Sequence, residues 1–369
     1  MGLLRNALAC VWVMLAVTEV HAAEKILIGM SAPLTGVLAP YGTELEKGLK
    51  LGVAQVNASG GIAGRDLEVL VKDDAGRADR GAANTKALLD AGVFALTGYH
   101  GSAAIEASLP LIEQSGVPLI GVASSAELLR EPARRNVFNL RAGAREEAAA
   151  MVLHLDTIGL TEVAAIAQDD ALGSAALDGV QVELTRLAIR PQALIRVPVE
   201  RGAGDINRVV QGACKNRPQA LMLGLNAANA LSVIRQARRI GCTPQFYVMS
   251  EAGAELLSLA ATPKELAGVI VSQVMPHPRS SSVPVTADYQ RLAGDAASYA
   301  GLEGFVYARV IAAAIKSCSS QLNRNCVVNA LDAKPIDVGG YRVQFKPGDR
   351  RGSRFVEMTI VTADGRFRR

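Results

Sequence analysis

Short runs of β-branched and aliphatic residues alternate with longer amphipathic segments along almost the whole chain, and this alternation restricts the possible fold more than any other feature. In the first part of the chain, the apolar runs are 26–30, 66–72, 93–97 and 117–122, and the segments between them are 43–57, 80–91 and 102–115. Within 43–57, Leu45, Leu49, Val53 and Val56 recur at helical spacing. Repeated strand–helix units predict an α/β protein with parallel sheets and helices on both faces.

The same rhythm resumes after Arg141. Strands are expected at 163–167, 193–197, 220–223, 245–249 and 269–274, with helices at 146–158, 174–187, 206–214 and 227–240. Helices at 286–299 and 303–317 follow, and then a β-rich tail at 341–345 and 355–361. Two series of four or more strands are too many for one sheet, so we expect two doubly wound parallel-sheet lobes joined by a hinge.

The predicted lobes exchange segments of the chain. We expect residues 23–141 plus about 276–340 in the first lobe, and residues 142–275 plus about 341–369 in the second, with crossovers near 140, 275 and 340–350. About 350 residues follow the predicted export signal, which agrees with two domains at ~150 residues each.

The first 22 residues have the order of an export signal. Arg5 gives a positive start, residues 7–17 are uncharged and mostly apolar, and Val20-His21-Ala22 offers small residues for cleavage after Ala22. The apolar run is shorter than the ~20 residues that span a bilayer. A buried N-terminal helix is the alternative. Cys10 is a poor lipid-anchor candidate because most of the run follows it, so we expect a periplasmic protein without an anchor.

Four cysteines follow the predicted cleavage site. An even number in an exported chain favours disulfides. Cys318 and Cys326 close a short polar segment and are the better pair, and Cys214 with Cys242 is the remaining possibility. Metal binding is the weaker alternative because no close CxxC pair or Cys/His cluster occurs. No metal is therefore expected.

Charge and motifs argue against several classes of function. The net charge of +4 is small, basic and acidic residues are mostly interspersed, and aromatics make up only 4%, so nucleic-acid binding is not expected. The chain has no GxGxxG, GxxxxGK[ST], HExxH or GxSxG motif, and GGIAG at 60–64 lies between a helix and a strand, which is the wrong context for a dinucleotide. We expect neither an enzyme nor a cofactor. Asp73-Asp74 and Asp169-Asp170 are better explained as strand-end and loop residues than as a metal or acid–base pair.

Several ordered segments are similar to one protein family. Residues 28–75 contain PLTG, YG, N-x-x-GGI-x-G and DD, and further matching segments are LTGYHGSAA (96–104), SGVPLIGVASSAELL (115–129) and RQARRIGCTPQF (235–246). From about residue 24 onward the chain resembles the Leu/Ile/Val-binding proteins, which have the type I periplasmic binding fold. The resemblance implies a monomer that closes on a small amino-acid-like ligand and delivers it to an ABC permease in the inner membrane. A sensory receptor for an amino acid or amide, without transport, is the alternative.

In the first lobe, the resemblance assigns ligand-binding residues to the ends of strands. Ser102 matches a serine that binds the ligand carboxylate, and its place at a helix N-terminus suits either an anion or a simple N-cap. Ala123 and Ser124 match positions that offer a carbonyl and a hydroxyl to the ligand's ammonium and carboxylate, and Ser125 is the alternative by one residue of register. Tyr41 is expected to pack over the ligand side chain, or else to stabilise the turn.

The second lobe departs from the family pattern. Leu172 stands where the family often has Tyr, and Asn226 stands where it often has an aromatic residue. Glu251 lies about one residue from the expected acid that holds the ligand ammonium, or is an exposed helix-start carboxylate. Because an unpaired buried ammonium costs several kcal/mol, an amino-acid ligand needs Glu251 or another acid. Without one, the ligand is a carboxylate or amide that has no ammonium.

Overall fold

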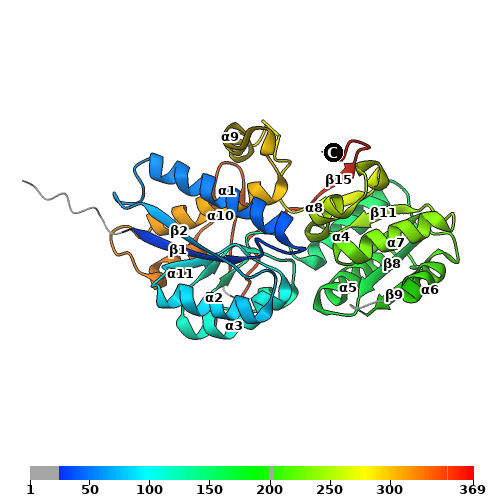
Figure 1. The fold of residues 1–369 in the computed structure, drawn as a ribbon, viewed down its shortest axis with the longest axis horizontal. Coiled ribbons are helices and arrows are strands. Elements are labelled where there is room, and N and C mark those ends of the chain that lie inside the picture. Colours follow the sequence, from blue (N-terminus) through cyan, green and yellow to red (C-terminus); the bar gives the residue numbers. More distant parts are fainter. Residues whose placement is uncertain (1–24, 199–202, 347) are drawn as a thin grey trace, which may run out of the picture.

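The structure, a computed structural model, describes residues 25–198, 203–346 and 348–369, and has two α/β lobes side by side (Figure 1). The predicted export signal and Cys10 lie outside the described residues. None of the helices within these ranges is long and apolar enough to cross a bilayer.

The first lobe is built on a five-stranded parallel sheet with the strand order β2-β1-β3-β5-β7. Its strands are β1 (Ile26–Ala32), β2 (Leu67–Asp73), β3 (Ala95–Thr97), β5 (Leu119–Ile120) and β7 (Val137–Phe138). A two-stranded ladder of β4 (Tyr99–His100) and β6 (Val122–Ala123) continues β3 and β5 towards the other lobe. The helices are α1 (Ala39–Ala58), α2 (Ala78–Asp90), α3 (Ser102–Ser115), η1 (Glu127–Arg130), α9 (Pro284–Ala293), η3 (Gly294–Ala296), α10 (Tyr299–Lys316) and α11 (Arg324–Ala333).

Alternate residues of β1 point to opposite faces of this sheet, as a strand requires. Ile26 and Ile28 belong to the core under α1 and α10, whereas Leu27 packs against the core under α2 and α3. Helices α1 and α10 approach very closely at Gly48, which has no side chain. A Cβ atom at this position would lie only 1.7 Å from the carbonyl oxygen of Gly301. The middle of α1 therefore packs against the first turn of α10, and the two helices lie side by side in the first lobe (Figure 1).

The second lobe has a seven-stranded sheet in the order β16-β15-β12-β11-β10-β8-β9. The parallel strands are β8 (Val163–Gln168), β9 (Ala193–Val197), β10 (Ala220–Gly224), β11 (Gln245–Val248) and β12 (Ile270–Gln273), and antiparallel β15 (Glu357–Val361) and β16 (Phe367–Arg368) complete it. One face is covered by α4 (Ala144–Thr157) and α5 (Ala171–Arg186). The other is covered by α6 (Ala203–Cys214), α7 (Ala227–Arg239), α8 (Ser250–Leu259) and η2 (Pro263–Leu266).

The chain passes between the lobes three times, after β7, after β12 and before β15. The first and third passages run side by side, and Asn139 donates its backbone N–H to the carbonyl of Arg350 at 3.1 Å. The hydroxyl of Tyr341 donates to the carbonyls of Leu140, at 2.7 Å, and Val274, at 3.4 Å, and so joins the first passage to the second. Short passages held together at one edge are what a hinge between two lobes requires.

The third passage lies later in the chain than the expected residue 341. The small hairpin of β13 (Ile336–Asp337) and β14 (Arg342–Val343), together with Tyr341 and Phe345, packs in the first lobe's core. The Phe345 ring meets Phe138 edge-on at 5.1 Å, which anchors this segment to the first sheet. The chain joins the second sheet only at Glu357, the first residue of β15.

Two disulfides join neighbouring helical segments within the lobes. Cys318 at the end of α10 is bonded to Cys326 in α11, and Cys214 at the end of α6 is bonded to Cys242 after α7. Each bond therefore closes a local loop and leaves the passages between the lobes free of covalent cross-links.

Candidate functional site

The ends of strands from both sheets meet between the lobes. In the first lobe, β6 ends in Ala123, and Ser124 and Ser125 follow it, all three buried. In the second lobe, α8 begins directly after β11, and its second residue is Glu251. The Glu251 carboxylate accepts a hydrogen bond from the backbone N–H of Ser125 across the gap. The site is therefore a junction at which polar groups of one lobe bind those of the other.

A second contact across the lobes is made by His100 at the end of β4. Its Nε2 atom lies 3.4 Å from Oε1 of Glu255, and its Nδ1 atom lies 2.7 Å from the carbonyl oxygen of Ala123. Burial of the ring favours its neutral form. The hydrogen bond to Glu255 and the charges of Glu251 and Glu255 outweigh this effect, so the pKa of His100 is raised. The ring also stacks on Tyr41 with 4.5 Å between centroids.

A buried guanidinium connects the lobes at the hinge. Arg141 is fully buried in the first passage, and its Nη1 atom donates to the Tyr41 hydroxyl at 3.0 Å. Its Nη2 atom donates to the Ser250 hydroxyl. Carboxylate oxygens of Glu147 and Glu303 lie 3.4 and 3.5 Å from the guanidinium. Because Tyr41 and Glu303 belong to the first lobe and Glu147 and Ser250 to the second, one cation links both.

The two carboxylates beside Arg141 also accept other hydrogen bonds. Burial raises the pKa of Glu147, and the charge of Arg141 and hydrogen bonds from Ser272 and Ser250 oppose that rise. Ser272 Oγ and the Ser250 backbone N–H lie 2.6 and 2.8 Å from Glu147 Oε2. Glu303 accepts from the Tyr41 hydroxyl. Buried charges persist when they are paired and hydrogen-bonded in this way.

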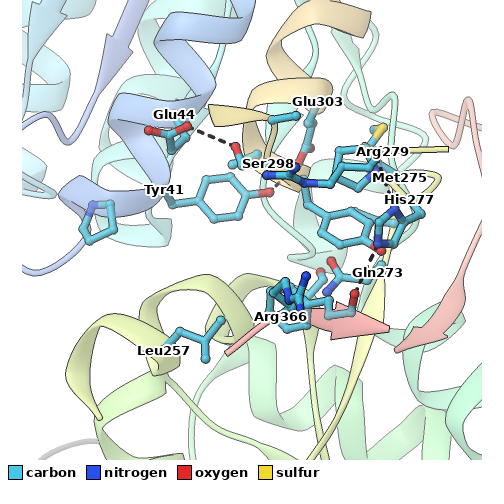
Figure 2. A pocket seen from close by; sticks show the side chains of 18 of the residues that line it. Tyr41, Glu44, Leu257, Gln273, Met275, His277, Arg279, Ser298, Glu303 and Arg366 are labelled. Carbon is cyan, nitrogen blue, oxygen red and sulfur yellow. Dashed lines mark hydrogen bonds between the residues drawn. The ribbon is translucent and has the colours of Figure 1, made fainter. Parts of the chain in front are cut away.

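A cavity of about 500 Å³ lies beside this junction, between α1 and the start of α10 on one side and α8, the end of β12 and β16 on the other (Figure 2). Figure 2 shows Tyr41 reaching from α1 towards Glu303, with Leu257 on the opposite lobe. Part of the wall is aromatic, since Tyr299 meets His277 and Phe367 edge-on at 5.7 and 5.8 Å. The volume lies within the ~300–1,000 Å³ that is usual for small-molecule sites.

The structure brings four of the predicted site residues together. Tyr41, Ala123, Ser124 and Glu251 all lie at the junction. The Ser124 hydroxyl is used locally, because it accepts from the Ala126 backbone N–H at 3.2 Å. Ser125 is the serine whose N–H faces the second lobe, and its buried hydroxyl has no hydrogen-bond partner among the described residues.

The other two predicted residues lie apart from this group. Ser102 is exposed at the first residue of α3. Asn226 is exposed and caps α7, where its side chain accepts from the Asn229 backbone N–H at 2.9 Å. Within the described ranges, no hydrogen bond joins either side chain to the opposite lobe.

Sequence reasoning missed His100 and Arg141. His100 lies three residues after the predicted strand 93–97 and two residues before Ser102, which is a position that could have been recognised. Arg141 was treated only as the boundary between two series of strands. Its importance comes from its complete burial beside two carboxylates, and neither charge nor spacing in the sequence reveals that burial.

Comparison with known proteins agrees with this architecture. An amino acid binding protein of Pseudomonas aeruginosa is 25% identical over 259 residues, which cover 68% of each chain. Leu/Ile/Val-binding protein homolog 2 of Brucella abortus is 27% identical over 113 residues, only 31% of this chain and 30% of that protein. The solved extracellular ligand-binding receptor of Verminephrobacter eiseniae superposes with a TM-score of 0.84 at 25% identity, covering 94% of this chain and 100% of that chain.

These relatives are binding proteins and not enzymes. A family profile described as periplasmic binding protein matches residues 25–366, which is nearly the whole described chain. The matching segment includes both lobes, the three passages between them and every residue of the junction. The chain therefore belongs to the periplasmic binding protein family.

Proposed function

We propose that this chain is the solute-binding component of an ABC importer outside the cytoplasm, and that it binds an amino acid or a similar small carboxylate or amide between its lobes. One observation carries the proposal: two contacts between polar groups at the strand ends of the two lobes each depend on a single side chain. His100 with Glu255 and Ser125 with Glu251 are the contacts concerned. Such contacts can break and re-form as the lobes move.

Physical reasoning supports hinge closure as the response to ligand. The lobes share three short passages, and each has its own core. A ligand shifts an open–closed equilibrium only through contacts that differ between the two states. A small molecule held by both lobes makes those additional contacts only in the closed state. The relatives named as amino acid binding or Leu/Ile/Val-binding support the ligand class.

Thermal unfolding with candidate ligands tests binding, and small-angle X-ray scattering tests closure. A ligand at a hundredfold excess over Kd stabilises the folded chain by about 2.7 kcal/mol, and the radius of gyration falls when the lobes close. Sucrose at the same concentration serves as the control for non-specific stabilisation. If amino acids, carboxylates and amides all leave the melting temperature and the radius unchanged, the proposal is refuted.

Transport is tested separately from binding. Membrane vesicles that contain the cognate permease should take up labelled ligand only when the loaded chain is added. Binding without such uptake would favour a sensory receptor, which is the other role that this fold could serve.

A further inference from the structure

The polar groups at the strand ends are already bound to each other. A zwitterionic amino acid needs an acceptor for its ammonium and a donor for its carboxylate. At this junction the acceptor, the carbonyl of Ala123, is 2.7 Å from the His100 ring, and the donor, the N–H of Ser125, is bound by Glu251. The chain's own imidazole and carboxylate therefore occupy the two positions that a zwitterion would use.

Exchange of these groups for a ligand brings little gain. A zwitterion at the junction would replace the His100 ring and the Glu251 carboxylate with its own ammonium and carboxylate, which are groups of the same kind. It would also have to separate His100 from Glu255, both of which are buried. Polar groups that lose their partners in a buried site pay the cost of desolvation. The neighbouring cavity offers a ligand new contacts without this loss.

Tyr41 separates the junction from the cavity. Its ring stacks on His100, and the same residue lines the cavity. The cavity wall continues through Leu257 of the second lobe, Tyr299 of the first and Phe367 of β16. Aliphatic and aromatic side chains from both lobes thus surround a space in which an apolar body of about the size of a phenyl ring can be buried.

The acidic residues of the cavity wall already accept hydrogen bonds from this chain's own donors. Glu303 accepts from the hydroxyls of Tyr41 and Tyr307. Glu44 accepts from the Ser298 hydroxyl at 3.1 Å and pairs with a lysine on its own helix. Both carboxylates therefore already have donors.

The basic residues of the wall retain donors for an anion. Arg366 uses Nε and Nη2 on Asp364, and a guanidinium carries five N–H donors in all. Arg279 donates from Nη2 to the backbone carbonyl of Asp295 at 2.6 Å, and its Nη1 lies 3.6 Å from the Asp295 carboxylate. In the part of the chain that the structure describes, no ion pair joins Arg368 to a carboxylate. Three guanidinium groups against two occupied carboxylates favour an anionic ligand.

We infer that the ligand is a monocarboxylate with an apolar body and no α-ammonium, bound in this cavity with its acid group towards Arg366 and Arg368. The inference rests on the proposed solute-binding function and specifies the ligand class and the part of the cleft that holds it. Tyr41, Leu257 and Phe367 bury the apolar body.

Calorimetric titration with three matched molecules tests this inference. The probes are 3-phenylpropanoate, L-phenylalanine, which adds the ammonium, and 2-phenylethylamine, which has no carboxylate. The acid should bind at least tenfold more tightly than the amino acid, and the amine should not bind. Leu257→Ala and Arg366→Gln should each weaken binding of the acid at least fivefold. Leu259→Ala, an exposed position on the same helix, and Arg186→Gln on α5 are the controls and should change nothing.

The outcomes separate this inference from the proposed function. If an amino acid binds more tightly than its deaminated acid, and Leu257→Ala leaves that binding unchanged, the ligand class is wrong and the receptor function stands. Binding of another apolar monocarboxylate with the same dependence on Leu257 and Arg366 would support the inference. If no amino acid, carboxylate or amide binds, both proposals fail.

Discussion

Replacement of Arg141 by methionine should destabilise the chain by about 3 kcal/mol. The substitution keeps an apolar chain of similar reach but leaves Glu147 and Glu303 buried without their shared cation. Removal of one partner from a buried ion pair costs ~3–5 kcal/mol. We expect the lower end of this range because Glu147 keeps its donors Ser250 and Ser272, and Glu303 keeps its tyrosine donors.

The loss in Arg141→Met should depend on pH. Burial already raises the pKa of Glu147, and Arg141 opposes that rise, so the variant raises this pKa further. A carboxyl group with a raised pKa in the folded state binds its proton more tightly there than in the unfolded state. The free energy of unfolding then falls as pH rises from the pKa of Glu147 in the unfolded chain, ~4.3, through its pKa in the folded chain. The deficit relative to wild type should be smaller at about pH 5 than at about pH 8.

Urea denaturation followed by circular dichroism measures this difference, since the chain's single tryptophan lies within the predicted export signal. Arg145→Met is the matched control, because this exposed arginine pairs with exposed Asp178 at 3.6 Å and should change stability by no more than about 0.5 kcal/mol. Arg141→Met/Glu147→Gln should recover part of the loss. A deficit below about 1 kcal/mol, or one equal to that of the control, would refute the role of Arg141 as the shared counter-ion.

Three further outcomes follow from single contacts. Replacement of both Cys214 and Cys242 by serine should cost about 3.5 kcal/mol in the chain-entropy model, because the bond spans 28 residues, and calorimetric melting measures it. His100→Gln should abolish a pH dependence of closure. Because the pKa of His100 is raised where its ring contacts Glu255, protonated His100 stabilises the closed form below pH ~6.5, and this stabilisation is lost as pH rises through the pKa of His100 in that form. Small-angle scattering can follow the change. Tyr41→Phe should cost about 1.5–3 kcal/mol by removing a hydroxyl bound to Glu303, while its ring still lines the cavity.

Each of these has a clear contrary result. Free thiols in the untreated chain would contradict the cysteine pairing. A radius of gyration with the same pH dependence in His100→Gln and in wild type would assign the titration elsewhere. For Tyr41→Phe, weaker ligand binding with unchanged stability would show that the hydroxyl contacts the ligand and not the hinge.

The fold was largely predictable because its signal is spread over many residues. Strand β1 and helix α1 follow from a periodic pattern in which no single residue decides the assignment, and the structure has both where they were expected. The segment of Tyr341 and Phe345 was assigned to the wrong lobe. Its apolar residues would suit an edge of either sheet, and only the contact of Phe345 with Phe138 determines which core it joins.

The site was less predictable because it depends on individual positions. The register of adjacent serines decides whether Ser124 or Ser125 faces the second lobe, and neither periodicity nor composition specifies a shift of one residue. The bonding of His100 and Glu251 at the junction depends on how closely the lobes approach. Sequence spacing could place these residues at strand ends, but the distance between the two sheets is a property of the folded chain.

Tyr41 provides a physical link between ligand binding and lobe closure. Its ring stacks on His100, which contacts the second lobe, and its hydroxyl lies between Arg141 and Glu303 at the hinge. The same side chain forms part of the cavity wall. A molecule that packs against the Tyr41 ring in the cavity restrains the orientation of this side chain. The contacts that His100 and Arg141 make with the second lobe both depend on that orientation. Contacts made in the cavity can therefore favour the closed state even though the ligand touches neither His100 nor Arg141.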